Sequence, residues 1–215
     1  MMSSRPLLLG HRGARKYAPE NTVEAFELAL QHGCDGFEFD VRYSSDGRCV
    51  ICHDAIHRRR RIRARLFSEL SLPGAEEVVR NFASRAYLDI ELKVAGDAGP
   101  IHRALGGQAT DHYVISSFLP GVLRVVAANE PSIPLGLICE NLRQLRVWPT
   151  LPITALMLHL RLASASLIEE LHSAKKQVFV WTVNKRRDME RLALLRVDGL
   201  ISDDTRLLAD TLKRH

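Results

Sequence analysis

Three acidic residues have the types and the spacing of a metal site. Glu38 and Asp40 stand two residues apart in the segment GFEFDVRY, and Glu91 lies in LDIELK. Successive strand residues point to opposite faces, so Glu38 and Asp40 share one face while apolar residues occupy the other. Carboxylates that converge in a packed interior need a cation to stay ionised. Ligation by oxygen alone favours Mg²⁺ or Ca²⁺ over zinc.

An ion-pair network is the alternative interpretation of the same acids. Arg42 shares the face of Glu38 and Asp40, and Lys93 shares the face of Glu91. Each of these cations could balance one carboxylate, and structural ion-pair networks also gather charges. The pattern alone therefore leaves both a metal site and a salt-bridge layer open.

Two histidines add proton-transfer chemistry to the acids. His11 follows the apolar run 6–9, and His53 follows the run 49–52. A pair of histidines can act as general base and general acid near neutral pH. Arg12 and Lys93 supply fixed positive charge, and such cations, together with a metal, bind a phosphate and stabilise its developing charge. The combination favours phosphoryl chemistry.

Strands must bring these distant residues together. Apolar runs predict strands at 7–11, 36–43, 86–93, 112–117, 135–140, 155–160, 178–183 and 199–202. Helices are predicted between and after them, near 23–30, 75–82, 101–105, 122–129, 142–147, 166–175, 187–195 and 205–213. Segment 48–52 follows a turn and is interpreted as an added hairpin arm. Asn21 is expected to cap the first helix, with Glu24 three residues later.

Eight strand–helix pairs in one chain of 215 residues predict a single-domain α/β fold, a closed (β/α)₈ TIM barrel. An open doubly wound sheet is the alternative, but it would be expected to carry a glycine-rich phosphate loop. Neither GxGxxG nor GxxxxGKS occurs in the sequence. In a barrel, active sites lie at the carboxyl ends of the strands, and that is where Glu38, Asp40 and Glu91 are placed.

Composition favours a globular domain with anionic partners. The chain is 46% hydrophobic and 26% charged, with a net charge of +5. It has no apolar stretch of about 18 residues, so no transmembrane segment is predicted. Four cysteines without a disulfide pattern favour a reducing, cytoplasmic location. Cys49 and Cys52 form a CxxC pair, but no second pair of zinc ligands accompanies it, so they are interpreted as buried strand residues.

Seven motifs, in order, resemble the glycerophosphodiester phosphodiesterase family. They are His11-Arg12-Gly13, Pro19-Glu20-Asn21-Thr22, Glu38-Phe39-Asp40-Val41 with Asp46-Gly47, His53-Asp54, 89–93 with 116–118, Trp181-Thr182-Val183-Asn184 and 197–203. The resemblance implies one phosphodiesterase domain over 1–215, with a short insert and helix at 55–87. It further implies a TIM barrel that hydrolyses a glycerophosphodiester to sn-glycerol 3-phosphate and an alcohol, in glycerophospholipid metabolism.

The resemblance also implies a role for each site residue. The implied ligands of Mg²⁺ or Ca²⁺ are Glu38, Asp40 and Glu91, and the implied acid–base pair is His11 and His53. The implied phosphate contacts are Arg12 and Lys93, and the implied pocket wall is Trp181. The implied supporting residues are Glu20 and Asn21. Trp181 has a second interpretation as a filler of the barrel interior. Which histidine is the acid, and whether water or a glycerol hydroxyl attacks, both stay open.

The segment after His53 departs from the family pattern. It is short, and six arginines occur in positions 58 to 65. Such a run predicts either a solvated loop or an anion patch at the barrel mouth that contacts anionic lipid. Nucleic-acid binding is not expected, because the run lacks interleaved aromatic residues. The C-terminal motif also departs, because it reads Ser202-Asp203-Asp204-Thr205 where the family favours a proline after Thr-Asp.

Two alternative functions use the same residues. One is lysophospholipase D-type hydrolysis of lipid headgroups, which would need an apolar groove for the acyl chain. The other is a catalytically silent barrel that binds phosphate. Every expected catalytic position holds the expected residue type, which argues against the silent barrel.

Overall fold

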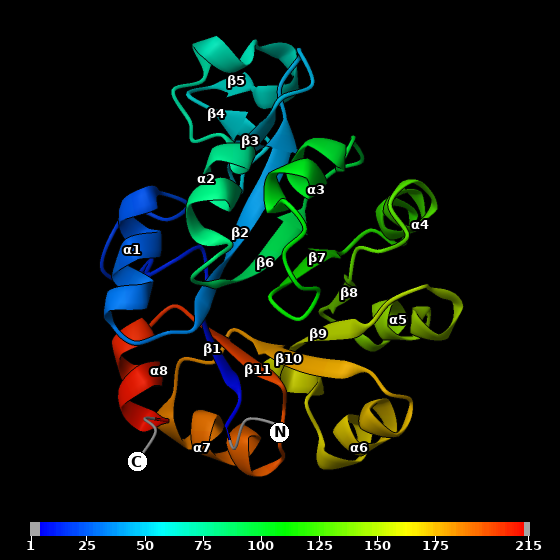
Figure 1. The fold of residues 1–215 in the computed structure, drawn as a ribbon. Coiled ribbons are helices and arrows are strands. Elements are labelled where there is room, and N and C mark those ends of the chain that lie inside the picture. Colours follow the sequence, from blue (N-terminus) through cyan, green and yellow to red (C-terminus); the bar gives the residue numbers. More distant parts are fainter. Residues whose placement is uncertain (1–4, 213–215) are drawn as a thin grey trace.

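Eight parallel strands form a closed barrel in the computed structural model, which describes residues 5–212. The barrel strands are β1 (Leu7–Gly10), β2 (Gly36–Tyr43), β6 (Tyr87–Leu92), β7 (Tyr113–Ser117), β8 (Leu135–Cys139), β9 (Ala155–His159), β10 (Gln177–Trp181) and β11 (Gly199–Ser202). They pair in the order β1-β11-β10-β9-β8-β7-β6-β2, and pairing of β1 with β2 closes the ring (Figure 1). The predicted (β/α)₈ barrel is confirmed, and the open sheet is excluded.

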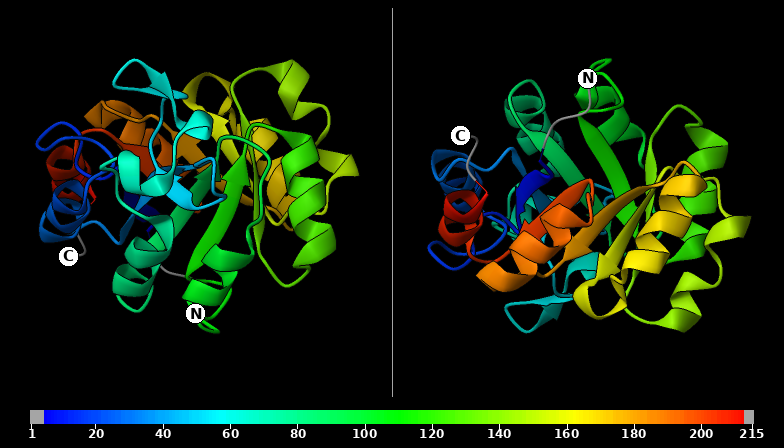
Figure 2. Two further views of the ribbon diagram at one scale, coloured as in Figure 1. Left: turned by 90° about the horizontal axis from the view of Figure 1, so that it is seen from above. Right: turned by 90° about the horizontal axis from the view of Figure 1, so that it is seen from below.

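Helices cover the outside of this barrel, as the views along the two opposite directions show (Figure 2). They are α1 (Val23–Gln31), α2 (Ala75–Phe82), α3 (Gly99–Leu105), α4 (Pro120–Asn129), α5 (Leu142–Leu145), α6 (Ala165–Ser173), α7 (Arg186–Leu194) and α8 (Thr205–Thr211). The predicted bounds hold for β2, α2 and β11, and the other elements shift by a few residues. The helix predicted near 142–147 ends at Leu145, and a 3₁₀ turn, Trp148–Thr150, follows it. The predicted end of the last helix at Lys213 lies outside the described residues.

Alternating strand residues build two apolar layers. Phe37 and Phe39 of β2 face the helices, and Phe37 stacks on Phe26 of α1 with ring centroids 4.2 Å apart. The other face points into the barrel, where a second cluster fills the interior: Leu9, Tyr87, Val114, Ile138, Ala155, Met157, Phe179 and Ile201. The interior is therefore packed, as in other barrels, and β2 contributes Glu38 and Asp40 to its inward face instead of apolar residues.

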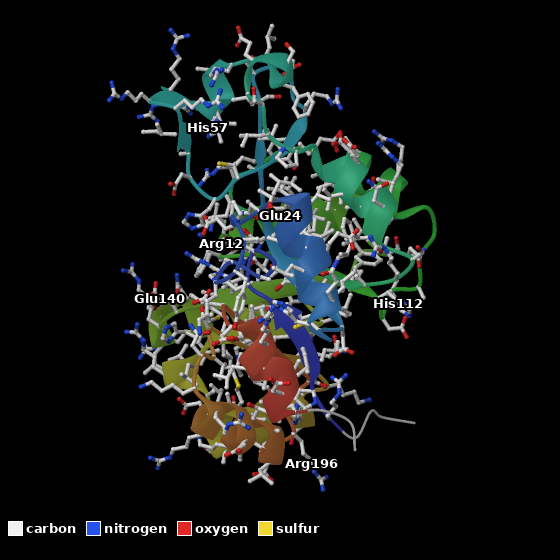
Figure 3. The ribbon with its side chains drawn as sticks, turned by 90° about the vertical axis from the view of Figure 1, so that its left-hand side faces the viewer. Arg12, Glu24, His57, His112, Glu140 and Arg196 are labelled. Atoms are coloured by element: carbon white, nitrogen blue, oxygen red, sulfur yellow. The ribbon has the colours of Figure 1, made fainter. Side chains whose placement is uncertain are left out.

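The chain leaves the barrel after β2 to form a small arm. β3 (Cys49–Ile51) runs antiparallel to β2, as predicted for segment 48–52. A hairpin of β4 (Ile56–His57) and β5 (Arg60–Arg61) follows, which was not predicted, with two 3₁₀ turns, Ile62–Ala64 and Phe67–Glu69. The hairpin lies at the top of Figure 1. In Figure 3 its His57 lies toward the same side as Arg12 and Glu140, whereas His112 lies toward the opposite side.

The cysteine pair of this arm is structural in character. Cys49 is completely buried in β3, and burial raises the pKa of its thiol to about 12. Burial also raises the pKa of the half-buried Cys52. Thiols with raised pKa values are poor nucleophiles and poor metal ligands, which agrees with the interpretation as strand residues. No helix between residues 5 and 212 combines the length and apolar character needed to cross a membrane.

Candidate active site

The carboxyl ends of β2 and β6 bring the predicted acids together. Glu38, Asp40 and Glu91 each offer an oxygen within 4.8 Å of the others, and all three residues are buried. The register of the two parallel strands explains this, because Asp40 lies opposite Glu91 and Glu38 lies opposite Asp89. Asp89 is also buried, and it accepts a 2.6 Å hydrogen bond from the hydroxyl of Ser116.

Burial and mutual repulsion disturb the ionisation of these acids. Burial, with Asp40 and Glu91 as further causes, raises the pKa of Glu38 well above its usual range. Burial raises the pKa values of Glu91 and Asp89 to about 7. At Asp40 burial is outweighed by Lys93 and Arg12, so its pKa is lowered. The cluster can therefore lose all of its protons at neutral pH only when further positive charge is present.

Two cations already contact the acids. Lys93 Nζ lies 2.7 Å from Glu91 Oε1 and 3.3 Å from Asp40 Oδ1, although neither contact has the geometry of a hydrogen bond. Arg12 Nε lies 3.2 Å from Asp40 Oδ2. Burial opposes the charge on Lys93, but the neighbouring carboxylates outweigh it and raise the pKa of Lys93. Four buried carboxylates thus face two cations, so ion pairing alone does not balance the cluster.

One oxygen of each predicted acid in the cluster has no hydrogen-bond donor among the described residues, and this favours a metal ion as its partner. Among the described residues, Glu38 Oε1, Asp40 Oδ1 and Glu91 Oε1 are buried and accept no hydrogen bond. Buried polar atoms normally have partners, so converging orphaned oxygens mark a place for a ligand. Hard divalent cations prefer such carboxylate oxygens. The donor set therefore fits Mg²⁺ or Ca²⁺.

A glycine turn carries Arg12 over the acids. Arg12 and Gly13 both have positive φ, 54° and 77°, and a Cβ at Gly13 would lie 2.6 Å from the backbone of α1. This turn directs the backbone N–H of Arg12 to Glu38 Oε2, at 2.9 Å. Glu20 accepts from Arg12 Nη1 at 2.9 Å and lies 3.0 Å from Arg15 Nη2, so it holds both guanidinium groups. Glu20 therefore contacts the loop that carries Arg12.

Asn21 contacts the acids as well, and the prediction that it caps α1 is wrong. Its backbone is left-handed, with φ 60°, and its amide donates to Asp40 Oδ2 at 2.8 Å. Thr22 caps α1 instead, because its hydroxyl accepts from the backbone N–H of Ala25 at 3.2 Å. Asparagine and threonine are both common helix caps, so the sequence alone does not tell which of Asn21 and Thr22 caps α1. The contact of Asn21 with Asp40 shows that Thr22 is the cap.

His11 is oriented by a chain of hydrogen bonds that the sequence did not reveal. Its Nδ1 lies 2.7 Å from Asp203 Oδ1, and Asn184 Nδ2 donates to Asp203 Oδ2 at 2.7 Å. Pairing of β1 with β11 brings Asp203 there from 192 residues away. Burial outweighs the attraction of Asp203 and lowers the pKa of His11, so the ring is neutral at pH 7. The other nitrogen, Nε2, lies 3.9 Å from Glu38 Oε2.

His53 approaches the cavity from the arm after β3. Its Nδ1 lies 2.9 Å from Asp54 Oδ1, and its side chain is 35% exposed. The guanidinium of Arg42 donates to the carbonyl oxygen of His53 at 2.9 Å from Nε and 2.7 Å from Nη2. The alternative that paired Arg42 with a carboxylate of the cluster is therefore wrong, since Arg42 fixes the backbone of His53 instead.

One cavity of about 210 Å³ joins most of the predicted site residues: His11, Arg12, Glu38, His53, Glu91, Lys93 and Trp181. Trp181 Nε1 donates to the carbonyl oxygen of Met157 at 3.0 Å, and its ring meets Phe118 and His159 edge-on. Trp181 thus lies in the wall of this cavity. Phe118 and Glu140 also line it. Phe118 belongs to one of the recognised motifs, but neither residue was predicted to be part of the site.

The arrangement agrees with a known family of enzymes. The sequence model of the glycerophosphoryl diester phosphodiesterase family matches residues 11–72 and 86–207. The chain belongs to this family. It is therefore a phosphodiesterase, an enzyme that hydrolyses phosphoric diesters.

Curated relatives span the chain almost completely. A glycerophosphodiester phosphodiesterase from Caldanaerobacter subterraneus subsp. tengcongensis is 27% identical, over 98% of this chain and 99% of its own. One from Bacillus altitudinis is 26% identical, over 91% of this chain and 94% of its own.

Solved structures share the fold of this phosphodiesterase. A glycerophosphodiester phosphodiesterase from Thermotoga maritima is 24% identical with a TM-score of 0.82, covering 96% of this chain and 98% of its own. A phosphodiesterase from Oleispira antarctica, in complex with the product sn-glycerol-3-phosphate, is 23% identical with a TM-score of 0.86, covering 98% of both chains. Both agree with the barrel described above.

Proposed function

We propose that this enzyme hydrolyses glycerophosphodiesters to sn-glycerol 3-phosphate and an alcohol, with a divalent cation on Glu38, Asp40 and Glu91. The observation that carries this proposal is the one cavity in which orphaned carboxylate oxygens meet two histidines and two cations. The names of the relatives support the substrate class, and so does the product in the Oleispira antarctica structure.

The cation would be Mg²⁺ or Ca²⁺. When bound, it would withdraw charge from the phosphate and lower the pKa of the attacking hydroxyl group. Each ligand residue has a second partner that keeps it in place: the backbone N–H of Arg12 for Glu38, Asn21 for Asp40 and Lys93 for Glu91. Such supporting contacts orient the ligand oxygens before the cation arrives.

Arg12 and Lys93 bind the phosphate oxygens, and the histidines move the protons. The carboxylate of Asp203 keeps a proton on Nδ1 of His11, so Nε2 is free to accept one. Asp54 lies against Nδ1 of His53 in the same way. One histidine takes the proton of the nucleophile, either water or the neighbouring glycerol hydroxyl, and the other protonates the leaving alkoxide. If the glycerol hydroxyl attacks, a cyclic phosphate forms first and water then opens it.

The leaving group separates the two histidine roles. A diester with an acidic phenol as its alcohol needs no proton on the leaving oxygen, whereas an aliphatic alkoxide does. Loss of the general acid should therefore slow hydrolysis of an aliphatic diester far more than that of a phenolic diester. Comparing His11→Ala and His53→Ala on both diesters assigns the acid. Equal losses on both diesters in both variants would contradict a division into acid and base.

The products identify the substrate class. Glycerophosphocholine and glycerophosphoethanolamine are incubated with the enzyme, and glycerol 3-phosphate is measured by a coupled assay while free choline or ethanolamine is measured separately. Equal release of glycerol 3-phosphate and the alcohol is expected. Release of phosphocholine instead would mean that the other ester bond breaks and would overturn the proposal.

The cavity volume bears on the lipid alternative. About 210 Å³ is below the roughly 300–1,000 Å³ typical of sites for drug-sized ligands, so it favours a small diester over a lysophospholipid. We also propose that segment 58–65 contacts anionic lipid surfaces, because Arg58, Arg59 and Arg60 are exposed beside Ile56, which is 55% exposed. The cytoplasmic location, the absence of nucleic-acid binding and the role in glycerophospholipid metabolism stay predictions.

A further inference from the structure

We propose that a second cavity beside the active site binds an anionic group, a further phosphate, on the alcohol part of the substrate. The inference rests on the proposed function and concerns which glycerophosphodiesters the enzyme prefers. The cavity has a volume of about 330 Å³ and is lined by Arg42, Arg61 and Arg63 together with Tyr43 and Ile62. We call it the arginine cavity.

The arginine cavity adjoins the active site through neighbours in the chain. Arg42 comes two residues after Asp40 on β2, and its guanidinium binds the carbonyl oxygen of His53. Val94, another lining residue, directly follows Lys93 of the active-site cavity. Both cavities therefore lie where β2 and β6 end. An alcohol that leaves from a phosphate on Lys93 therefore departs beside the arginine cavity.

Among the residues that the structure describes, no carboxylate pairs with the arginines of the arginine cavity. Within residues 5–212, none of Arg42, Arg61 and Arg63 forms an ion pair, and no acidic residue lines the cavity. The acids of the surrounding segment have other partners. Asp46 accepts from Ser44 and from the backbone of Phe67, Glu69 accepts from the backbone of Leu66, and Asp54 lies 2.9 Å from Nδ1 of His53.

Three guanidinium groups without an ion pair favour an anionic ligand, and the paired donors come from Arg61 and Arg63, because Nε and Nη2 of Arg42 already donate to the carbonyl oxygen of His53. Guanidinium offers planar pairs of N–H donors that match phosphate oxygens, and it stays charged at every physiological pH. Tyr43 and Ile62 add apolar wall, so the cavity also suits the carbon skeleton that carries such a phosphate. A second phosphate on the alcohol satisfies both features, whereas a choline or ethanolamine cation would meet like charge.

An apolar anchor holds two of the arginines in position. Ile62 is 1% exposed and packs with Val50 and Leu70 in a small cluster of its own. Its backbone N–H also donates to the carbonyl oxygen of Ala55 at 3.0 Å. Arg61 and Arg63 flank this buried residue, so their backbone is fixed at the rim of the cavity. The arginine run is thus divided into an anchored part and a free part.

The free part is the tip of the hairpin, and it offers a matched control. Arg58 and Arg59 form the two-residue turn between His57 and Arg60, with φ 48° and 64°. Both tip arginines are exposed, and neither lines the arginine cavity. They carry the same charge in the same segment, so replacing them tests nonspecific attraction. They are also the residues that a lipid surface would meet first.

The experiment compares two diesters that share the glycerophosphate and differ in the alcohol. In the first the alcohol is glycerol, and in the second it is glycerol that carries a further glycerophosphate. The ratio of kcat/KM for the second diester to that for the first is measured in wild type, in Arg61→Gln with Arg63→Gln, and in Arg58→Gln with Arg59→Gln. The wild type should prefer the second diester. The cavity variant should lose about tenfold of that preference, and the tip variant should keep it.

Two results would overturn the inference. They are an unchanged ratio in the cavity variant and an equal loss in the tip variant. If the cavity variant keeps its ratio and loses binding to phosphatidylglycerol vesicles, the cavity is assigned to a lipid headgroup instead. If neither diester is hydrolysed by any of the proteins, the proposed function fails. Calorimetric Kd values for the two diesters on the same three proteins then decide the inference alone.

Discussion

Replacement of Asp203 by asparagine should slow turnover by moving the proton on His11. Asp203 accepts at both oxygens, from His11 at Oδ1 and from Asn184 Nδ2 at Oδ2. Asn184 cannot reverse its amide, because its own oxygen accepts from the hydroxyl of Ser202 and from the backbone N–H of Asp203. An asparagine at position 203 would therefore turn its oxygen to Asn184 and its amino group to His11 Nδ1. The ring would then carry its proton on Nε2, the nitrogen nearest Glu38.

The size of this effect follows from the contact that is lost. The bond between His11 and Asp203 is 2.7 Å long and charged, with the two side chains 15% and 31% exposed. Such hydrogen bonds contribute about 1.5–3 kcal/mol, which corresponds to roughly 10- to 150-fold in kcat. The partial exposure of Asp203 favours the lower half of this range.

The assay measures kcat and KM on glycerophosphoethanolamine at saturating metal, with metal affinity measured separately by calorimetry. Asp204→Asn is the matched control, because it makes the same chemical change one residue away on a carboxylate that binds Lys16 and Tyr17. Only Asp203→Asn should lose kcat, and neither variant should lose metal affinity. A wild-type kcat in Asp203→Asn would refute the positioning of His11 by Asp203.

Three further predictions test the rest of the site and the fold. Glu38→Ala should abolish metal binding and hydrolysis together and leave circular dichroism unchanged, whereas undiminished activity would remove Glu38 from the ligands. His53→Ala should lower turnover by about 10²-fold or more with metal affinity retained, and a wild-type rate would make His53 structural. Asp204→Ala should lower the free energy of unfolding by about 2 kcal/mol, because it removes the cap of α8 and the acceptor of Tyr17. Lys16 and Tyr17 outweigh burial and lower the pKa of Asp204, so this stability is present above the unfolded pKa of about 3.9 and is lost as pH falls through the lower folded value. Thermal unfolding should therefore separate wild type from Asp204→Ala at pH 7 and bring them together in acid, and equal melting at pH 7 would contradict the role.

The inward acids were predictable because a strand has a fixed period. Alternation along the strand places Glu38 and Asp40 on one face and the apolar residues of β2 on the other, which packs against the helices. This holds whichever strands lie next to β2. The predicted bounds of β2 hold for the same reason, since eight residues of strict alternation leave one register. The approach of Glu91 then followed from pairing of consecutive parallel strands.

Features that depend on distant contacts or unusual backbone could not be predicted. Asp203 lies in a recognised motif, but its role appears only when β11 pairs with β1 and brings it to His11. The hairpin after β3 lacks the usual Asn-Gly signal, because Arg58 and Arg59 occupy the two positions of positive φ. Asparagine is a common helix cap, but the side chain of Asn21 donates to Asp40 and does not cap α1.

The measurement that tests the metal-dependent hydrolysis most directly uses enzyme stripped with EDTA. Glycerophosphocholine and glycerophosphoethanolamine are supplied with no metal, with Mg²⁺ or with Ca²⁺, and glycerol 3-phosphate is detected by the coupled assay. The cluster of Glu38, Asp40 and Glu91 predicts that stripping stops release, that one of the two metals restores it, and that Glu38→Ala stays inactive with either. Full release from stripped enzyme in EDTA would contradict the metal site.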